Sequence, residues 1–326
     1  SPSSAASDVY KRQSFLLSQE PLLFVALVTL QSIFLSISTP AWNSLLGDYT
    51  DLLTRGTTLG RIGSVSQLSG VLAMIIILLL TYGFKGEMTP SFFIVPFLLS
   101  ACSNILGAFL VLLLKERRVR APPSLRSALI NPLRDRDFRR FLVVSGLYWF
   151  AMSFAWPIFP YVIVRVVQAS MWQLALISAV SYSISSLAQS RVGVLADRFG
   201  RKPLILIGRA AFFLFPLLYA FARSWLHLLA IESFLSVFMG MITVTITTYI
   251  IDLAPWGQRA SYTASSNLVF GLASFTGSLV GGAFTSMLSP IMGEGGAIFT
   301  GLITSACLRI ITSMGFLFIK ETLPEG

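Results

Sequence analysis

Long apolar stretches alternate with short polar ones along almost the whole chain. Nine of them are long enough for a membrane-spanning helix, which needs about 20 apolar residues. They lie at about 22–42, 62–82, 91–114, 141–164, 171–190, 203–222, 226–251, 264–288 and 296–319. The pattern therefore predicts an all-α membrane protein with nine transmembrane helices.

Composition supports this prediction and excludes several classes of protein. Of the 326 residues, 55% are hydrophobic and only 12% are charged, whereas soluble domains are about 45–50% apolar and about 25% charged. A soluble enzyme, a disordered chain and a fibre are excluded. The sequence lacks a G-x-x-x-x-G-K-[ST] segment, so ATP hydrolysis within this chain is not expected to power transport. Cys102 and Cys307 lie inside apolar runs, so neither a disulfide, a metal site nor a cofactor is predicted.

The formal net charge of +10 has an explanation in topology. The connections after the first, third, fifth, seventh and ninth stretches hold 17 Lys and Arg residues, whereas the other four connections hold two. Basic residues collect in cytoplasmic loops. The distribution predicts a multi-pass protein of the plasma membrane with a cytoplasmic C-terminus, in contact with the lipid bilayer and without a nucleic-acid partner.

Two polar segments fall outside the predicted helices. Residues 1–13 read SPSSAASDVYKRQ, resemble translated sequencing-adapter read-through, and are expected to be non-native or disordered; an ordinary polar tail is the alternative. The basic, proline-containing segment 115–140 is predicted to be a cytoplasmic linker, with a surface helix over 124–140 as a further option. It divides the chain into 14–114, with three spans, and 141–326, with six.

An internal repeat supports this division. Asp48 is followed seven residues later by Arg55, and Asp252 is followed seven residues later by Arg259. Both pairs lie in predicted cytoplasmic loops and are offset by 204 residues. Each loop connects an apolar span to a span rich in small residues. The repeat predicts two related halves.

The segment 193–202 reads GVLADRFGRK and lies in a predicted cytoplasmic loop. It resembles the loop signature G-x-L-a-D-r-x-G-r-k of the major facilitator superfamily. This resemblance implies a helical bundle of two pseudo-symmetric halves. In the family the signature recurs in the first half, and the offset would place that copy before residue 1. The nine spans would then correspond to helices four to twelve of twelve, in an N-terminally truncated chain.

The resemblance also implies a conformational switch. In the family, the acidic and basic residues of this loop clamp neighbouring helices in one of two alternating states. Asp197 and Arg201 would here contact Asp252 and the start of the helix near 57–61. The expected switch residues are Gly193, Asp197, Arg198, Gly200, Arg201, Lys202, Asp252, Arg259, Asp48 and Arg55. The alternative is that Arg198, Arg201 and Lys202 only anchor the topology.

The predicted spans also contain candidates for substrate binding. Glu232 is an acid inside a span, where a charge is costly and suggests a function as proton carrier or cation partner. Trp149 and Trp156 share one helix face with Ser145 and Met152, and could stack on an apolar or cationic substrate, or simply pack. The remaining candidates are Tyr148, Tyr182, Gln31 and Asn267. Arg165, Arg209 and Arg309 are interpreted respectively as an interfacial anchor, a topological charge and a structural partner.

These features predict a monomeric secondary transporter rather than an enzyme. It would move a small solute by alternating access, driven by a proton or solute gradient. A receptor or scaffold without transport activity is the main alternative. Drug efflux by antiport is less supported, because the glycine-rich stretch Gly63–Gly70 and the apolar run after it contain no proline.

Overall fold

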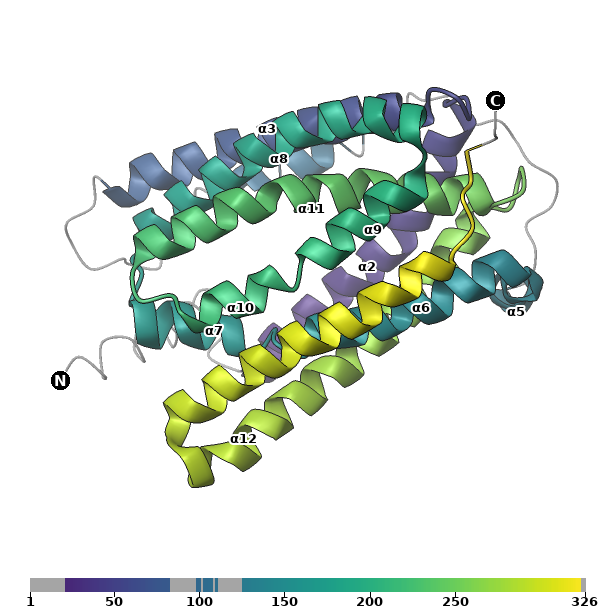
Figure 1. Cartoon of the computed structure of the whole chain (residues 1–326). Coiled ribbons are helices and arrows are strands. Elements are labelled where there is room, and N and C mark those ends of the chain that lie inside the picture. Colours follow the sequence, from purple (N-terminus) through teal and green to yellow (C-terminus); the bar gives the residue numbers. More distant parts are fainter. Residues whose placement is uncertain (1–20, 83–97, 101, 108, 111–124, 324–326) are drawn as a thin grey trace.

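A computed structural model describes residues 21–82, 98–100, 102–107, 109–110 and 125–323. The predicted non-native segment 1–13, most of the predicted span 91–114 and part of the linker 115–140 lie outside these residues. Every described secondary-structure element is a helix (Figure 1).

The helices follow the apolar stretches of the sequence. The first two long ones are α2 (Pro21–Asp48) and α3 (Arg55–Tyr82). The later chain forms α5 (Leu125–Ile130), η1 (Asn131–Arg134), α6 (Arg136–Ser153), α7 (Ile158–Tyr161), the π-helical η2 (Val162–Val167), α8 (Met171–Phe199), α9 (Arg201–Ala211), α10 (Leu214–Ala220), α11 (Trp225–Leu253), α12 (Arg259–Ser313) and η3 (Met314–Phe318). Within 125–140, where a surface helix was one option, the structure has three helical elements, α5, η1 and the start of α6; a place on the membrane surface stays a prediction.

Side-chain caps explain where several helices begin. Asp135 Oδ1 accepts hydrogen bonds from the backbone N–H groups of Asp137 and Phe138, at 2.9 and 3.2 Å, at the start of α6. At the start of α8 the Gln173 side chain accepts a hydrogen bond from the backbone N–H of Ser170 at 2.8 Å. Each cap satisfies an N–H group that has no partner within its helix.

Within the part of the chain that the structure describes, six helical segments are long and apolar enough to cross a membrane, at 55–82, 136–167, 171–199, 201–220, 225–253 and 259–318. The predicted spans 264–288 and 296–319 both fall in the last of these. Gly293 has a φ of +73°, a value that L side chains rarely adopt, and α12 reverses there into two antiparallel arms (Figure 1). The number nine stays a prediction, because the span 91–114 is mostly outside the described residues and the span 22–42, which lies in α2, is not among these six segments.

Helix α3 packs along α8, α6 along α12, and α11 along α8. The α3–α8 contact is unusually close because glycines form it. A Cβ atom on Gly60 would lie 2.4 Å from the backbone oxygen of Gln189, and one on Gly193 would lie 2.3 Å from that of Gly56. Any larger residue at these positions would force the two backbones apart.

Candidate functional site

Several helix ends and turns meet at one end of the bundle. They are the end of α2, the start of α3, the α8–α9 turn and the α11–α12 turn, and the C-terminal segment lies beside them (Figure 1). In the sequence interpretation this is the cytoplasmic end. The charged residues of the GVLADRFGRK segment and of the two repeated loops gather here.

Asp197 caps helix α3 from the end of α8. Its Oδ1 accepts a hydrogen bond from the backbone N–H of Gly56 at 2.8 Å. Its Oδ2 accepts from the backbone N–H and the hydroxyl of Thr57, both at 2.7 Å. A carboxylate at a helix N-terminus is stabilised by free N–H groups and by the helix dipole. Gly56 permits this approach, because a Cβ there would lie 2.6 Å from Oδ1.

Asp252 is the centre of a buried charge cluster. Arg55 of α3 forms an ion pair with its Oδ1, and Nε of Arg201 lies 2.9 Å from its Oδ2. Thr322 donates its hydroxyl proton to the same Oδ2 at 3.2 Å. Two cations thus compensate one buried anion. Such a cluster is costly to disrupt, because removing one partner leaves an uncompensated charge.

Arg201 connects the two carboxylates. Its side chain has no exposed surface, and its Nη2 lies 3.2 Å from Oδ1 of Asp197 in addition to the contact with Asp252. It also donates to the backbone oxygens of Ala196 and Leu52, both at 2.9 Å. The guanidinium group therefore contacts the connection between α2 and α3, the end of α8 and the end of α11.

Each arginine of the two repeated loops pairs with the aspartate of the other loop. Arg55 pairs with Asp252 rather than with Asp48 of its own loop, and Arg259 Nη1 lies 2.7 Å from Asp48 Oδ1. The Arg259 side chain crosses the end of α2 over Gly47, where a Cβ would lie 2.4 Å from its Cδ. The repeat thus produces two reciprocal ion pairs between the predicted halves, an arrangement that the sequence interpretation did not foresee.

The C-terminal segment contributes residues that the sequence interpretation missed. The Glu321 carboxylate accepts hydrogen bonds from the backbone N–H groups of Arg201 and Lys202, both at 2.9 Å, and so caps α9. It is held in place by the N–H groups of Thr322 and Leu323. Gly200 precedes Arg201 and Lys202, and its φ of +92° lets the chain turn against the Glu321 carboxylate.

The Glu321 cap gives a first testable prediction. Replacing Glu321 by alanine removes both acceptors at the start of α9, and losing such a cap costs about 0.5–2 kcal/mol. We expect the amides of Arg201 and Lys202 to exchange hydrogen about 2- to 30-fold faster, as measured by hydrogen–deuterium exchange. Glu294→Ala, in the turn between the two arms of α12, is the control and should leave these amides unchanged. Equal protection in both variants would contradict the capping role.

The other expected switch residues are placed less centrally. Gly193 provides the close contact with Gly56, and Lys202 takes part through its backbone. Arg198 is exposed and lies over the Phe199 ring at 5.2 Å. For Arg198 the geometry fits the simpler role of a topological anchor.

The candidate substrate residues do not form one cluster. The Tyr219 hydroxyl donates to Glu232, and Tyr182 packs against Gly70 of α3. Tyr148 is fully buried and donates to the backbone oxygen of Arg209 at 2.9 Å. Asn267 is half-buried on α12. Gln31 lies on α2, but its side chain is outside the described part of the chain.

Trp149 and Trp156 remain together on α6 and the turn after it. Their rings meet edge to face at 6.2 Å, and Trp149 also stacks on Phe270 of α12 at 5.7 Å. Trp156 is 42% exposed. The sequence prediction of a shared face is consistent with this contact, while the role of that face in binding stays a prediction.

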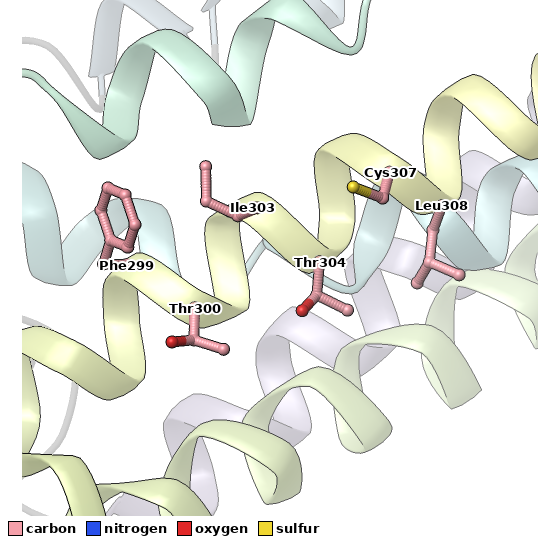
Figure 2. A pocket seen from close by; sticks show the side chains of 6 residues that line it. All are labelled: Phe299, Thr300, Ile303, Thr304, Cys307 and Leu308. Carbon is pink, nitrogen blue, oxygen red and sulfur yellow. The ribbon is translucent and has the colours of Figure 1, made fainter.

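A separate pocket lies on the second arm of α12 (Figure 2). Its volume is about 320 Å³, and it is lined by Phe299, Thr300, Ile303, Thr304, Cys307 and Leu308. None of the predicted substrate-binding residues lines it. Its lining comes from one helix arm and is mostly apolar, which is typical of a surface that faces lipid.

Comparison with known proteins decides the family. The sequence profile of the Major Facilitator Superfamily matches residues 13–144 and 141–325, almost the whole chain. The chain belongs to the major facilitator superfamily. The resemblance of the GVLADRFGRK segment is confirmed, as is an all-α membrane fold of the superfamily type.

Individual members of the superfamily are more distant. The chain is 31% identical over 110 residues to the efflux pump dotC of Dothistroma septosporum, a match covering 33% of this chain and 19% of dotC. It is 29% identical over 102 residues to the uncharacterised transporter MJ1560 of Methanocaldococcus jannaschii, covering 31% of this chain and 26% of that protein. These matched stretches span about a fifth to a quarter of the relatives' own lengths.

Solved structures agree on the fold. A structure of the fucose:proton symporter FucP of E. coli superposes with a TM-score of 0.62 at 15% identity, covering 86% of this chain and 73% of FucP. A second FucP structure, described as being in the outward conformation, gives a TM-score of 0.61 at 15% identity, with 86% and 72% coverage. At this identity the comparison speaks for the superfamily fold and not for a substrate.

Proposed function

We propose that this protein is a secondary transporter that moves a small solute across the plasma membrane by alternating access, and not an enzyme. The observation that carries the proposal is the reciprocal pairing of Arg55 with Asp252 and of Arg259 with Asp48. Both ion pairs join the predicted half 14–114 to the predicted half 141–326. A protein with two halves that rock against each other needs contacts of this kind.

The contacts exist only while this end of the bundle is closed. To open it, α3 must leave α8, and then Asp197 loses its hydrogen bonds to Gly56 and Thr57. A hydrogen bond to a charged group contributes about 1.5–3 kcal/mol. Interactions present in one state bias the equilibrium by their differential energy. The network therefore acts as a latch that favours the state closed at this end.

The charge distribution in the loops assigns this end to the cytoplasm. On this assignment the structure is closed toward the cytoplasm. We interpret it as an outward-facing state. The C-terminus, with Glu321 bound at the start of α9, lies on the same side. The transporter would act as a monomer, because the paired halves belong to one chain.

The flux experiment that tests this function uses the protein in proteoliposomes with a trapped pH-sensitive dye. A panel of sugars, amino acids and organic acids is supplied under an imposed proton or solute gradient. We expect at least one solute to move, and Asp197→Ala to slow its movement while incorporation into the membrane stays normal. Absence of any solute movement under every gradient would favour a scaffold without transport activity.

Glu232 is the proposed coupling site. It is a half-buried carboxyl group within α11, and Tyr219 from the neighbouring helix donates to it. The tyrosine hydroxyl stabilises the ionised carboxylate, so the pair could take up and release a proton as its surroundings change. Of the described acidic residues, it is the one positioned within a span rather than at a helix end.

Removing the charge of Glu232 should separate proton movement from solute movement. We expect Glu232→Gln to abolish solute-dependent acidification of the vesicles, while exchange of labelled solute across equal concentrations continues. Tyr219→Phe is the matched variant and should keep coupling with an altered pH dependence. Coupled transport that is unchanged in Glu232→Gln would assign the coupling elsewhere.

Export of a solute is the second candidate. The local identity to the efflux pump dotC favours it. Flux measured in vesicles of both orientations distinguishes export from uptake.

A further inference from the structure

Two arginine side chains meet in the interior of the bundle formed by α6, α9 and α12. Arg209 and Arg309 are each 1% exposed. Both guanidinium groups contact Met152, since Arg209 Nη1 lies 4.0 Å from its Sδ and Arg309 Nη2 lies 2.8 Å from its backbone oxygen. Among the described residues, no acidic side chain forms an ion pair with either of them.

Arg309 has a structural explanation. Its Nη1 donates to the backbone oxygen of Phe212 at 3.0 Å. In a continuous helix this oxygen would accept from residue 216, which is a proline without an N–H group. Among the described backbone N–H groups, the Phe212 oxygen accepts only from that of Phe215, at 3.3 Å, and the Met152 oxygen near the end of α6 lacks its usual donor, because Trp156 N bonds to Ser153 instead. Arg309 thus compensates two helix breaks, and the sequence interpretation of a structural partner fits it.

Arg209 has no such explanation. Its guanidinium carbon lies 4.4 Å from the ring centre of Tyr148, 5.6 Å from that of Trp149 and 5.7 Å from that of Phe316. Aromatic faces attract a cation, but they do not replace the hydrogen-bond acceptors that a guanidinium group requires. The Nε and Nη2 atoms of Arg209 have no hydrogen-bond partner in the described structure. A buried cation without an anion is costly.

The helices that pack around Arg209 carry other unused hydrogen-bond donors. The indole Nε1 of Trp149 is buried and unpaired, as are the hydroxyl of Ser145, one helical turn away on α6, and Nε of Arg309. A hydroxyl can also accept, but the indole and guanidinium groups are donors only. Anions are bound in proteins by such unused hydrogen-bond donors beside a positive charge.

A series of aromatic contacts extends from Arg209 to an exposed side chain. The Trp149 ring contacts both Arg209 and Trp156, the latter edge to face, and Trp156 is 42% exposed. The positive charge also argues against the cationic substrate that the aromatic face alone would allow.

We propose that Arg209 and the indole N–H of Trp149 form a binding site for a small monovalent anion, a halide or a carboxylate. Ser145 and Arg309 Nε supply further donors. The anion is either a resident ion that compensates the buried charge or the transported solute itself. Only the second source rests on the proposed function.

Thermal unfolding of the detergent-solubilised protein tests the binding. Sodium chloride, acetate or benzoate replaces bulky gluconate at constant ionic strength, so that general screening is unchanged. We expect one of these anions to raise the midpoint temperature by about 2–4 °C at ten times its dissociation constant. Arg209→Met should lose this rise and should be at least as stable as the wild type in gluconate, because the uncompensated charge is gone. Arg223→Gln, which removes an exposed arginine, is the control and should keep the rise.

A second variant keeps the proposal falsifiable if Arg209→Met does not fold. Trp149→Phe retains an aromatic ring but lacks the N–H group. It should lower the affinity for the anion about tenfold. The proposal is overturned if no small anion stabilises the wild type, if Arg209→Met responds like the wild type, or if Trp149→Phe leaves the affinity unchanged.

Uptake of the radiolabelled anion into proteoliposomes then distinguishes the two sources. Movement of the anion identifies it as substrate, while stabilisation without movement identifies it as a resident ion; both outcomes support the site. Because the unfolding measurement needs no transport, failure of the anion site and failure of the transport function are seen separately.

Discussion

Replacing Asp252 by alanine is expected to open the end of the bundle that the latch closes. Two buried guanidinium groups, those of Arg55 and Arg201, would lose their common anion. Breaking a buried ion pair by removing one partner costs about 3–5 kcal/mol. This cost falls on the closed state alone, because the open state exposes both arginines to water. The ratio of closed to open molecules should therefore fall by more than about 100-fold.

The opening can be measured by cysteine labelling. Leu59 on α3 is 6% exposed, and Leu59→Cys in a background without Cys102 and Cys307 reports whether α3 has left its neighbours. We expect maleimide labelling to be much faster when Asp252→Ala is added. Asp51→Ala, which removes an exposed aspartate from the connection between α2 and α3, is the control. Slow labelling in both variants would show that the cluster does not hold this end closed.

A valine at Gly60 should produce the same open state for a steric reason. Its Cβ would lie 2.4 Å from the backbone oxygen of Gln189 and 3.0 Å from Cα of Gly193. Backbone atoms in packed helices have no room to retreat, so α3 and α8 must separate. We expect transport to fall at least about tenfold and the Leu59→Cys label to react faster, although every charged residue is still present.

Gly271→Val is the matched control for Gly60→Val. Both replacements put a β-branched residue into a helix, with a similar local cost. A Cβ on Gly271 has no atom within 4 Å, so this variant should transport and label like the wild type. Equal loss of transport in the two variants would attribute the effect to helix propensity rather than to the close contact of α3 with α8.

The fold was predictable from the sequence because it depends on local properties. Apolar length determines a span, and five of the six segments long enough to cross a membrane each contain one predicted span. The reversal at Gly293 divides the sixth segment as the apolar pattern implied. The contacts of Asp197 and Arg201 lie where the family resemblance placed them, although their role as a switch stays a prediction.

The partners within the site were less predictable, because they depend on how the helices lie in space. The repeat revealed Asp48, Arg55, Asp252 and Arg259, but it did not reveal that each base pairs with the acid of the other loop. Glu321 was missed because nothing in its local sequence shows that the chain returns to the start of α9.

The aromatic face of α6 shows the same limit. A helical period identifies Ser145, Trp149, Met152 and Trp156 as one face, but it does not say what covers that face. Tyr148 is buried against Arg209, and its expected place near a substrate stays a prediction. The arginine comes from α9, about 60 residues later in the chain, and only the tertiary structure brings it to the rings.

The exchange of partners between the two loops has a consequence for how such a sequence evolves. A change at position 48 cannot be compensated at position 55 in the same loop, since its partner is 211 residues away at position 259. Position 55 likewise depends on its ion-pair partner at position 252. Substitutions should therefore co-vary across the two halves and not within either of them. A half replaced by its counterpart from a relative would bring the acid of one pair and the base of the other, and both pairs would have to match before the chimera could close.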